Sequence, residues 1–272
     1  FAAVILAGAL LLMLPFASQS GRVTPFDETL FTATSAVCVT GLVVQDTATY
    51  WSYFGQAVIL LLIQIGGMGV ITVAAFFALL SGRRISLMQR GTMQEAISAP
   101  KVGGIVRLTG FILRAVFLIE GIGAACLAPV FVRDFGLRGV WMAVFHSISA
   151  FCNAGFDLMG YKALYSSFTA EYDSIIINVT IMSLIVIGGI GFIVWDDISK
   201  HGLHFKKYML HTKIVLSTTA FLIFGGAFLF YIFERNNLMA DMSVKGKILS
   251  SLFSSVTART AGFNTIDTAS LT

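Results

Sequence analysis

Long apolar stretches separated by short polar segments dominate the sequence of this chain. Five of them are long enough to cross roughly 30 Å of hydrocarbon as helices at about 1.5 Å per residue. They cover residues 1–16, 54–80, 105–132, 175–195 and 214–233. The pattern therefore predicts an all-α polytopic membrane protein. The first stretch begins at Phe1 without Met, a charged leader or a small-residue cleavage site, so we expect a transmembrane helix cut at its start rather than a signal peptide.

A short helix that cannot span the membrane is predicted between the first two stretches. Thr24 is a candidate N-cap, Pro25 suits the first helical position, and Asp27 and Glu28 follow in the first turn. β-branched residues and then Gly41 end this helix after about a dozen residues, fewer than the roughly 20 that a spanning helix needs. We therefore expect a re-entrant helix, and the non-helical segment after it must be surrounded by protein or by a water-filled path.

The stretch at residues 31–42 has recognisable copies at 145–156 and 252–263. Each copy has a bulky apolar residue, then small and hydroxyl residues, then a glycine that is followed by Leu or Phe. The glycines are Gly41, Gly155 and Gly262. Because internal repeats indicate repeated structural units, each unit is predicted to run as helix, short pore helix, extended glycine turn and helix.

A second pattern, I-x-I-G-G-x-G, occurs at residues 63–69 and 185–191, in the helix after each of the first two glycine turns. Paired glycines allow two helices to approach closely, and this is the favoured interpretation. A local bend or hinge is the alternative, because glycine pairs weaken a helix.

The repeats divide the chain into units and loops. These are a first unit at 1–82, a cytoplasmic loop at 83–104, a second unit at 105–197, a second cytoplasmic loop at 198–212 and an incomplete third unit at 213–272. The returning helix of the third unit and a fourth unit are expected to be absent from this chain, which looks like a fragment.

Charged residues are scarce, at 12%, and the mean hydropathy is +0.86, which argues against a water-soluble domain. Lys and Arg collect at residues 83–107 and 200–213. The positive-inside rule makes these loops cytoplasmic, together with the N-terminus, and puts the three repeated stretches near the outer face. The net charge of +4 therefore comes from the loops predicted to be cytoplasmic. Without an aromatic-basic motif it does not indicate a nucleic-acid partner.

Isolated polar residues inside the apolar stretches are predicted to be structural. For Glu120 we favour a hydrogen bond to a neighbouring pore loop over a cation site, because an intramembrane carboxylate needs a partner. His146 is interpreted as a packing histidine, since no second ligand stands at chelating spacing. Cys38, Cys126 and Cys152 are expected to be small buried filler residues rather than a disulfide framework or a metal site.

One glycine at the same place in each repeat suits a cation filter. Such a filter replaces the water around an ion with backbone carbonyls, and aiming successive carbonyls at one axis requires conformations that glycine adopts at low cost. The expected ion-binding residues are Cys38, Val39, Thr40, Gly41, Cys152, Asn153, Ala154, Gly155, Arg259, Thr260, Ala261 and Gly262. The C-terminal ends of the preceding short helices add partial negative charge. The filter segments contain no ring of acids, which argues against selectivity for divalent ions.

Arg259 stands within the third of these segments. A cation held in the ion path would repel the permeant ion, so we expect this side chain to turn away and to pair behind the filter. The candidate partners are Asp157, Asp267 and Glu120.

The loops ATSAVCVTGLVV, SISAFCNAGFDLMG and SSVTARTAGFNTID, together with the two IGGxG helices, resemble those of the Trk/Ktr/HKT superfamily of potassium transporters, and most closely the membrane subunits of bacterial Ktr systems. The likeness spans essentially the whole chain. It implies four non-identical helix–pore loop–helix units around one pseudo-fourfold pore. It also implies that Gly41, Gly155 and Gly262 are filter glycines and that potassium is the ion held by the filter carbonyls. Glycine in every visible loop suits potassium, since relatives with serine at the first position favour sodium.

The same resemblance implies potassium uptake across the plasma membrane, often sodium-dependent. The implied partners are a second copy of the chain, giving a homodimer, and a cytoplasmic ring of KtrA-like nucleotide-binding regulatory subunits. No organic cofactor is expected in this chain. Whether the basic loops at 83–107 and 200–213 dock the regulator stays open at this point.

Two other classes of protein fit the sequence less well. A polytopic membrane enzyme would need catalytic groups inside the bundle, and only Glu120, His146 and a few amides qualify, without an HExxH, GxSxG or paired-aspartate motif. A secondary transporter built from inverted repeats is disfavoured because these repeats share one orientation.

Overall fold

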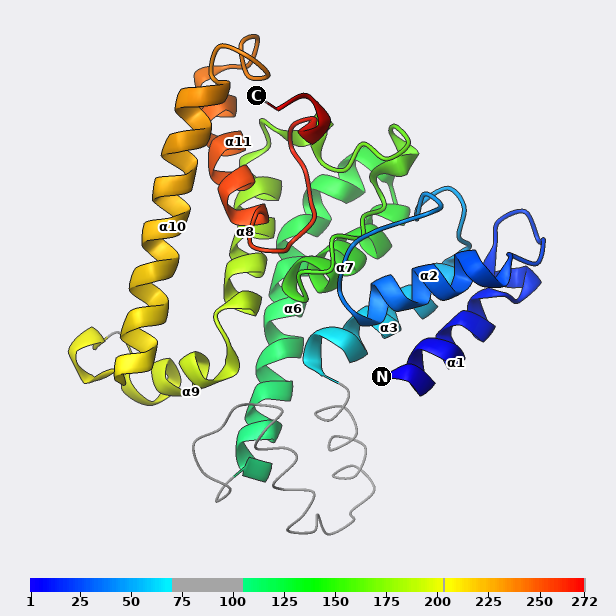
Figure 1. Cartoon of the computed structure of the whole chain (residues 1–272), viewed down its shortest axis with the longest axis horizontal. Helices are drawn as coiled ribbons and strands as arrows, with labels where there is room; N and C mark the ends of the chain where they lie inside the picture. The colour runs from blue at the N-terminus through cyan, green and yellow to red at the C-terminus, as the bar shows by residue number, and fades with distance from the viewer. Residues whose placement is uncertain (70–104, 203, 272) are drawn as a thin grey trace. The chain divides into compact units, whose positions relative to one another are not determined.

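The computed structural model describes residues 1–69, 105–202 and 204–271. Regular secondary structure in these ranges is entirely helical, apart from an isolated bridge between Ser18 and Trp51 (Figure 1). The all-α prediction is therefore confirmed. The chain forms two compact units. The first contains Phe1–Gly67, Glu120–Gly189 and Leu222–Thr272, and the second contains Met68–Ile119 and Ile190–Phe221.

Two described helices are long and apolar enough to cross a membrane: residues Leu108–Phe135 of α6 (Ile105–Phe135), and α10 (Leu210–Glu234). A third span is possible by length and composition if α8 (Ile175–Gly189) and α9 (Phe192–His201) are counted together. The helices α1 (Ala2–Leu12) and α3 (Tyr53–Met68) are apolar but shorter. Most of the predicted span at 54–80 beyond α3 lies outside the described residues, as does the predicted loop at 83–104.

The apolar run predicted at 175–195 is interrupted, because α8 ends at Gly189 and α9 begins at Phe192. Between them Gly191 has a φ of 91°, a left-handed conformation that only glycine adopts at low cost. The hinge interpretation of the paired glycines therefore applies just after the second pair.

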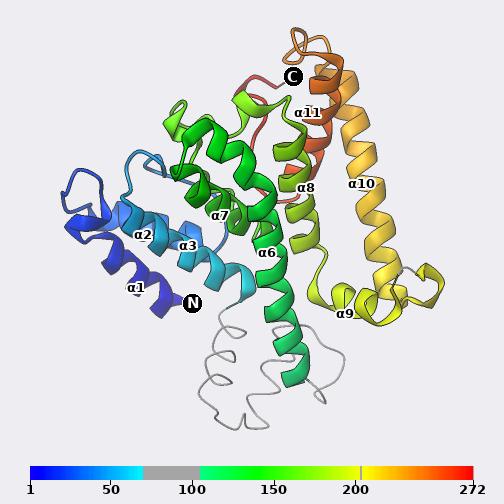
Figure 2. The same ribbon diagram turned by 180° about the vertical axis from the view of Figure 1, so that it is seen from behind.

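Three short helices in the first unit carry the repeated stretches: α2 (Phe26–Val37), α7 (Arg138–Phe151) and α11 (Val244–Thr257). Their existence and approximate bounds agree with the sequence pattern. The α2 helix packs against α1, and both α7 and α11 pack against α8. The loops that follow the three helices lie side by side within the first unit, as both views of the ribbon show (Figures 1 and 2).

The start of α2 differs from the prediction. Pro25, not Thr24, is the N-cap, and no side chain caps the helix. Thr24 is buried, and its hydroxyl accepts a hydrogen bond from the Tyr50 hydroxyl at 3.1 Å. In contrast, Ser243 caps α11 by accepting a hydrogen bond from the Gly246 N–H at 3.0 Å.

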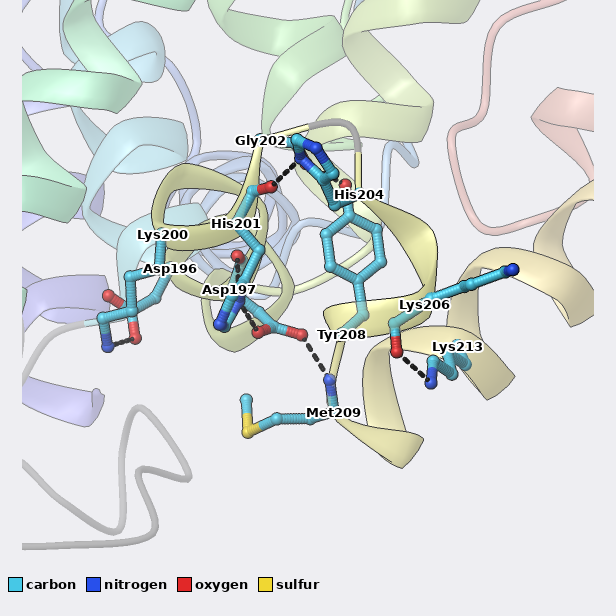
Figure 3. Close-up of polar contacts among 10 residues, drawn as sticks. All are labelled: Asp196, Asp197, Lys200, His201, Gly202, His204, Lys206, Tyr208, Met209 and Lys213. Atoms are coloured by element: carbon cyan, nitrogen blue, oxygen red, sulfur yellow. Dashed lines mark hydrogen bonds and ion pairs between the residues drawn. The ribbon is translucent and has the colours of Figure 1, made fainter.

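The described part of the second unit contains a polar hairpin between α9 and the start of α10, which Figure 3 shows in close-up. The buried Asp197 accepts a hydrogen bond from the Met209 N–H at 2.8 Å and contacts Nδ1 of His201 at 2.9 Å. Burial favours the neutral acid, but these and neighbouring donors lower the pKa of Asp197 below its ordinary value. The segment predicted as a loop at 198–212 is thus a folded hairpin that includes the short helix η4 (Phe205–Lys207).

The remaining short helices join the larger elements. They are η1 (Pro15–Ala17), η2 (Met159–Tyr161), η3 (Thr169–Glu171) and η5 (Thr268–Ser270).

Candidate functional site

The first repeated loop begins with a closed cap at the end of α2. The N–H of Val39 donates to the Ala36 carbonyl at 3.3 Å and the N–H of Thr40 donates to the Ser35 carbonyl at 2.9 Å, the pair of bonds that defines a Schellman cap. The Thr40 hydroxyl also donates to the Ser35 hydroxyl at 2.9 Å. Val39 has a φ of 57°, which is strained for a β-branched residue. The cap thus fixes the direction of the chain as it leaves the helix.

The second loop repeats this cap with different side chains. The N–H of Asn153 donates to the Ala150 carbonyl at 3.1 Å, and the N–H of Ala154 donates to the Ser149 carbonyl at 2.8 Å. Asn153 has a φ of 56°, a conformation that asparagine tolerates better than valine does. The backbone of the first two loops is therefore the same although their sequences differ.

The third loop leaves its helix by a different set of bonds. The N–H of Arg259 donates to the Val256 carbonyl at 3.2 Å, and the N–H of Ala261 donates to the Thr257 carbonyl at 3.0 Å. Thr260 is the left-handed residue here, with a φ of 71°. As in the other loops, the left-handed residue stands two positions before the glycine.

The three repeat glycines meet one another. Their φ angles are 75° at Gly41, 72° at Gly155 and 78° at Gly262. A Cβ atom added to Gly155 would lie 3.3 Å from Cα of Gly41 and 3.0 Å from Cα of Gly262. A Cβ added to Gly262 would meet only atoms of Gly155 within 4 Å. Gly155 therefore lies between the other two, as expected of three consecutive members of a ring.

A hydroxyl of the pore helix holds the backbone just past the glycine in two of the loops. The Ser149 hydroxyl donates to the Phe156 carbonyl at 2.6 Å, and the Thr257 hydroxyl donates to the Phe263 carbonyl at 2.6 Å. These bonds tie each extended segment back to the helix from which it came. They give a structural role to Ser149 and Thr257 of the second and third stretches.

The first glycine of each IGGxG motif lets its helix contact the end of the short helix before it in the repeat, α2 or α7. A Cβ added to Gly66 would lie 2.2 Å from the Val37 carbonyl oxygen, and one added to Gly188 would lie 1.8 Å from the Phe151 carbonyl oxygen. No side chain fits at such distances, so the close-packing interpretation is confirmed at these two positions. The close approach also permits weak Cα–H···O contacts.

The second glycine of each motif faces a loop residue. A Cβ added to Gly67 would lie 2.5 Å from Sγ of Cys152, in the next repeat. One added to Gly189 would lie 3.2 Å from the end of the Asn153 side-chain amide and 3.8 Å from Nη2 of Arg259. The helix α3 thus contacts the first and second repeated segments, and α8 contacts the second and third.

The ion pairs predicted between Arg259 and Asp157 or Glu120 are not found among the described residues, and the pairing with Asp267 stays a prediction. The Nη1 atom of Arg259 is buried without a hydrogen-bond partner in the described part of the chain. Nη2 of Arg259 instead lies close to the end of α8, 3.8 Å from a Cβ added to Gly189.

Glu120 is bonded to a different element from the one predicted. Its Oε1 accepts a hydrogen bond from Nε2 of Gln64 in α3 at 2.9 Å, and not from a pore loop. Its backbone carbonyl does accept a bond from the Ser147 hydroxyl of α7 at 2.6 Å. With only 4% of its surface exposed, Glu120 thus links α6 to two neighbouring helices, in keeping with a structural role.

His146 is a satisfied packing histidine, as predicted. It is fully buried, and its Nε2 accepts a hydrogen bond from the Leu158 N–H at 3.0 Å, so Nδ1 carries the proton and donates to the Met142 carbonyl at 2.7 Å. Its ring packs against Phe131 and Phe168, with centroids 5.1 Å from each. This contact ties α6, α7 and the segment before η3 together.

The expectation of buried cysteines holds only for Cys152. Cys126 is exposed on α6, a long apolar helix that has many exposed apolar side chains, and Cys38 is exposed at the end of α2. Apolar character in a membrane protein does not imply burial in the protein, since lipid is also an apolar environment.

A cavity of about 150 Å³ adjoins the three glycines. Its walls include Asp46, Asp157 and Asn264, which follow the glycines of the first, second and third loops. Burial raises the pKa of Asp157 to about 6, the N–H of Met159 partly offsets this rise, and the charge of Asp46 adds to it. Sequence reasoning considered Asp157 only as a partner of Arg259. Its position two residues after a repeat glycine was the signal that could have placed it at this cavity.

Comparison with known families gives a match to the TrkH family of cation transport proteins over residues 1–272. The chain belongs to this family. It is 44% identical, over 98% of its length, to the potassium/sodium uptake protein NtpJ of Enterococcus hirae. It is 38% identical to the Ktr system potassium uptake protein B of Vibrio alginolyticus, over 98% of its length, and to that of Bacillus subtilis, over 100%.

This TrkH-family chain spans 58% of the first two relatives and 60% of the third. The resemblance seen in the loop sequences is confirmed. The family consists of membrane proteins that transport cations, so the polytopic-enzyme interpretation is set aside.

Proposed function

We propose that this chain forms part of a pore that translocates potassium ions across the cell membrane. The observation that carries the proposal is the order of contacts at the three glycines, with Gly155 between Gly41 and Gly262. Three consecutive members of a fourfold ring would have this order, because neighbours touch and opposite members do not. The names of the relatives, which include potassium uptake proteins, support the choice of ion.

The proposed ion ligands are backbone carbonyls of the segments that end at the glycines. They are Cys38, Val39, Thr40, Gly41, Cys152, Asn153, Ala154, Gly155, Arg259, Thr260, Ala261 and Gly262. In each segment two left-handed residues alternate with residues of negative φ, which turns successive peptide planes and lets several carbonyls face one axis.

Selectivity for a monovalent cation follows from what lines this path. The filter segments contain no carboxylate, and neutral carbonyls replace a shell of water without the charge density that favours divalent ions. The C-terminal ends of α2, α7 and α11 point their partial negative charge at the same loops. Potassium is the expected transported ion. We further propose that its uptake depends on sodium.

The wider assembly is also a proposal. We place the pore loops on the outer side of the plasma membrane and the N-terminus and the α9–α10 hairpin in the cytoplasm. We propose a complete pore of four helix–pore loop–helix units in each subunit of a homodimer, seated on a ring of nucleotide-binding regulatory subunits. The three repeats support the repeated units, and the word "system" in the names of two relatives supports a transporter with several components. The Asp197 hydrogen bonds fold the hairpin at 192–213, with its lysines, into a shape that could dock such a regulator (Figure 3).

Uptake of Rb⁺ by a potassium-deficient bacterial strain tests the proposal. The protein that carries this chain is expected to restore uptake and growth at low potassium. Gly41→Asp should abolish uptake or its preference for K⁺ over Na⁺, because a side chain at this glycine collides with the Ala154 carbonyl oxygen, which would lie 2.7 Å from the added Cβ. Val39→Ala, which leaves the backbone intact, should transport. Unaltered selectivity in Gly41→Asp would contradict the proposal.

A further inference from the structure

The cavity beside the glycines is built by the same position of all three repeats. Val43, Asp157 and Asn264 each stand two residues after a repeat glycine, and all three line it. Tyr165 and Ser167, from the segment at 165–167, also line it. Here the N–H of Tyr165 donates to Asp46 Oδ2 at 3.2 Å, and Ser167 Oγ accepts from the Asn264 N–H at 3.1 Å. The cavity therefore lies where the three loops meet, and hydrogen bonds hold its walls in place.

Its two carboxylates differ in what they can still bind. Asp46 is 7% exposed, and both of its oxygens are occupied: Oδ1 accepts from Ala48 N–H at 3.1 Å and from Thr49 N–H and hydroxyl at 2.9 Å each, and Oδ2 accepts from Tyr165 N–H. Asp157 uses only Oδ1, which accepts from Met159 N–H at 2.8 Å. Among the described residues Oδ2 of Asp157 has no hydrogen-bond donor. Asp46 is thus structural, and Asp157 has one oxygen free for a ligand.

Asn264 offers a second oxygen. Both backbone polar groups of Asn264 are hydrogen-bonded: its N–H donates to Ser167 Oγ at 3.1 Å, and its carbonyl accepts from the Phe168 N–H at 2.8 Å. These bonds fix the residue at the cavity wall, while its side-chain amide has no hydrogen bond to the described residues. An amide oxygen and a carboxylate oxygen are the hard ligands that alkali and alkaline-earth cations prefer.

We propose that this cavity binds a partly hydrated monovalent cation through Asp157 Oδ2 and the amide oxygen of Asn264, at the side of the glycines from which the ion enters. The inference rests on the proposed function and deepens it. A volume of about 150 Å³ holds a few waters of about 30 Å³ each around an ion and excludes a large organic cation. A single free carboxylate oxygen suits a monovalent ion, whereas calcium sites use several.

Loss of the charge on Asp157 tests the site. Asp157→Asn keeps the shape and the Oδ1 acceptor for Met159, so it removes charge with little change to the fold. We expect the external Rb⁺ concentration for half-maximal uptake to rise about tenfold with the maximal rate retained, since a carboxylate at a narrow mouth concentrates cations locally. Asp157→Glu should return it towards the wild-type value.

The matched control is Asp173→Asn. This carboxylate is 53% exposed and contacts Lys245 and Ser243, away from the cavity, so its loss should change half-maximal uptake less than twofold. If Asp157→Asn behaves like this control while Gly41→Asp loses uptake, the cavity site is overturned and the pore stands. If wild-type protein supports no Rb⁺ uptake, the proposed function itself fails.

A gain of charge gives an independent test. Asn264→Asp puts a second carboxylate beside Asp157, and Val43→Asp does so from the first loop at the same repeat position. Both variants should make Rb⁺ uptake about tenfold more sensitive to external Ca²⁺, because two carboxylates form a better calcium site. Unchanged Ca²⁺ sensitivity in both variants would overturn the site.

Discussion

The first two loops and the third reach the same glycine conformation by different backbone routes. After α2 and α7, two hydrogen bonds close a Schellman cap, and the chain turns at Val39 and Asn153. After α11 the turn comes one residue later, at Thr260, and Arg259 is the additional residue. What is kept in all three loops is the left-handed residue two positions before a left-handed glycine. The three repeats therefore share the backbone conformation at the glycines, whereas the hydrogen bonds at the end of the preceding helix differ.

The largest expected effect breaks the shared feature. Gly155→Ala introduces a Cβ that lies within 3.3 Å of both Gly41 and Gly262, at a φ of 72°. We expect Rb⁺ uptake to be abolished while the protein still reaches the membrane. Gly21→Ala is the control, because Gly21 is also left-handed, with a φ of 68°, but has nothing within 4 Å. Uptake by Gly155→Ala equal to that of the control would refute the tight ring.

A second test compares the two glycines that support the second loop. Gly188→Ala places a Cβ 1.8 Å from the Phe151 carbonyl oxygen, a backbone atom that cannot move aside, whereas Gly189→Ala meets the end of the Asn153 side chain at 3.2 Å. Overpacking against backbone should cost about 1–3 kcal/mol of stability. Thermal unfolding of detergent-purified protein should show a clear decrease for Gly188→Ala and a smaller one for Gly189→Ala. Equal decreases would contradict the packing account.

The strained residue of the first loop sharpens the comparison with the second. A left-handed conformation costs a β-branched residue about 1–2 kcal/mol, and asparagine less. Val39→Asn should therefore stabilise the protein, and Asn153→Val should destabilise it by a similar amount, as measured by the same thermal unfolding. If both substitutions shift stability in the same direction, the two caps do not share one backbone.

The smallest expected effect concerns the hydroxyl bonds past the glycine. Ser149→Ala and Thr257→Ala each remove a bond of 2.6 Å to a carbonyl, which should lower stability by about 0.5–1.5 kcal/mol. Thr34→Ala is a matched control, because the Leu30 carbonyl, in an exposed turn of α2, is the one hydrogen-bond partner of its hydroxyl among the described residues. Losses no larger than that of the control would mean that these bonds do not hold the loops.

Much of this site was predictable because glycine and helix periodicity carry strong local signals. The three pore helices, the repeat glycines and the close packing of Gly66 and Gly188 all follow from patterns within about a dozen residues. The break after α8 was predictable only as an alternative, since paired glycines serve both packing and bending.

Other features depend on contacts that sequence does not encode locally. Intrinsic preference argues against a left-handed valine, and only the cap bonds at the end of α2 impose that conformation on Val39. The partner of Glu120 lies in α3, far away in the chain, and the free oxygen of Asp157 is recognised only after the donors around Asp46 have been assigned. Burial of Cys126 was misjudged because apolar residues on a long membrane helix can face lipid.

The most direct measurement of the central claim is the location of the ion. Crystals of the complete transporter grown in Rb⁺ should show anomalous density between the loops that end at Gly41, Gly155 and Gly262, within coordinating distance of their carbonyl oxygens. Rb⁺ found only elsewhere, in protein that transports it, would contradict the account.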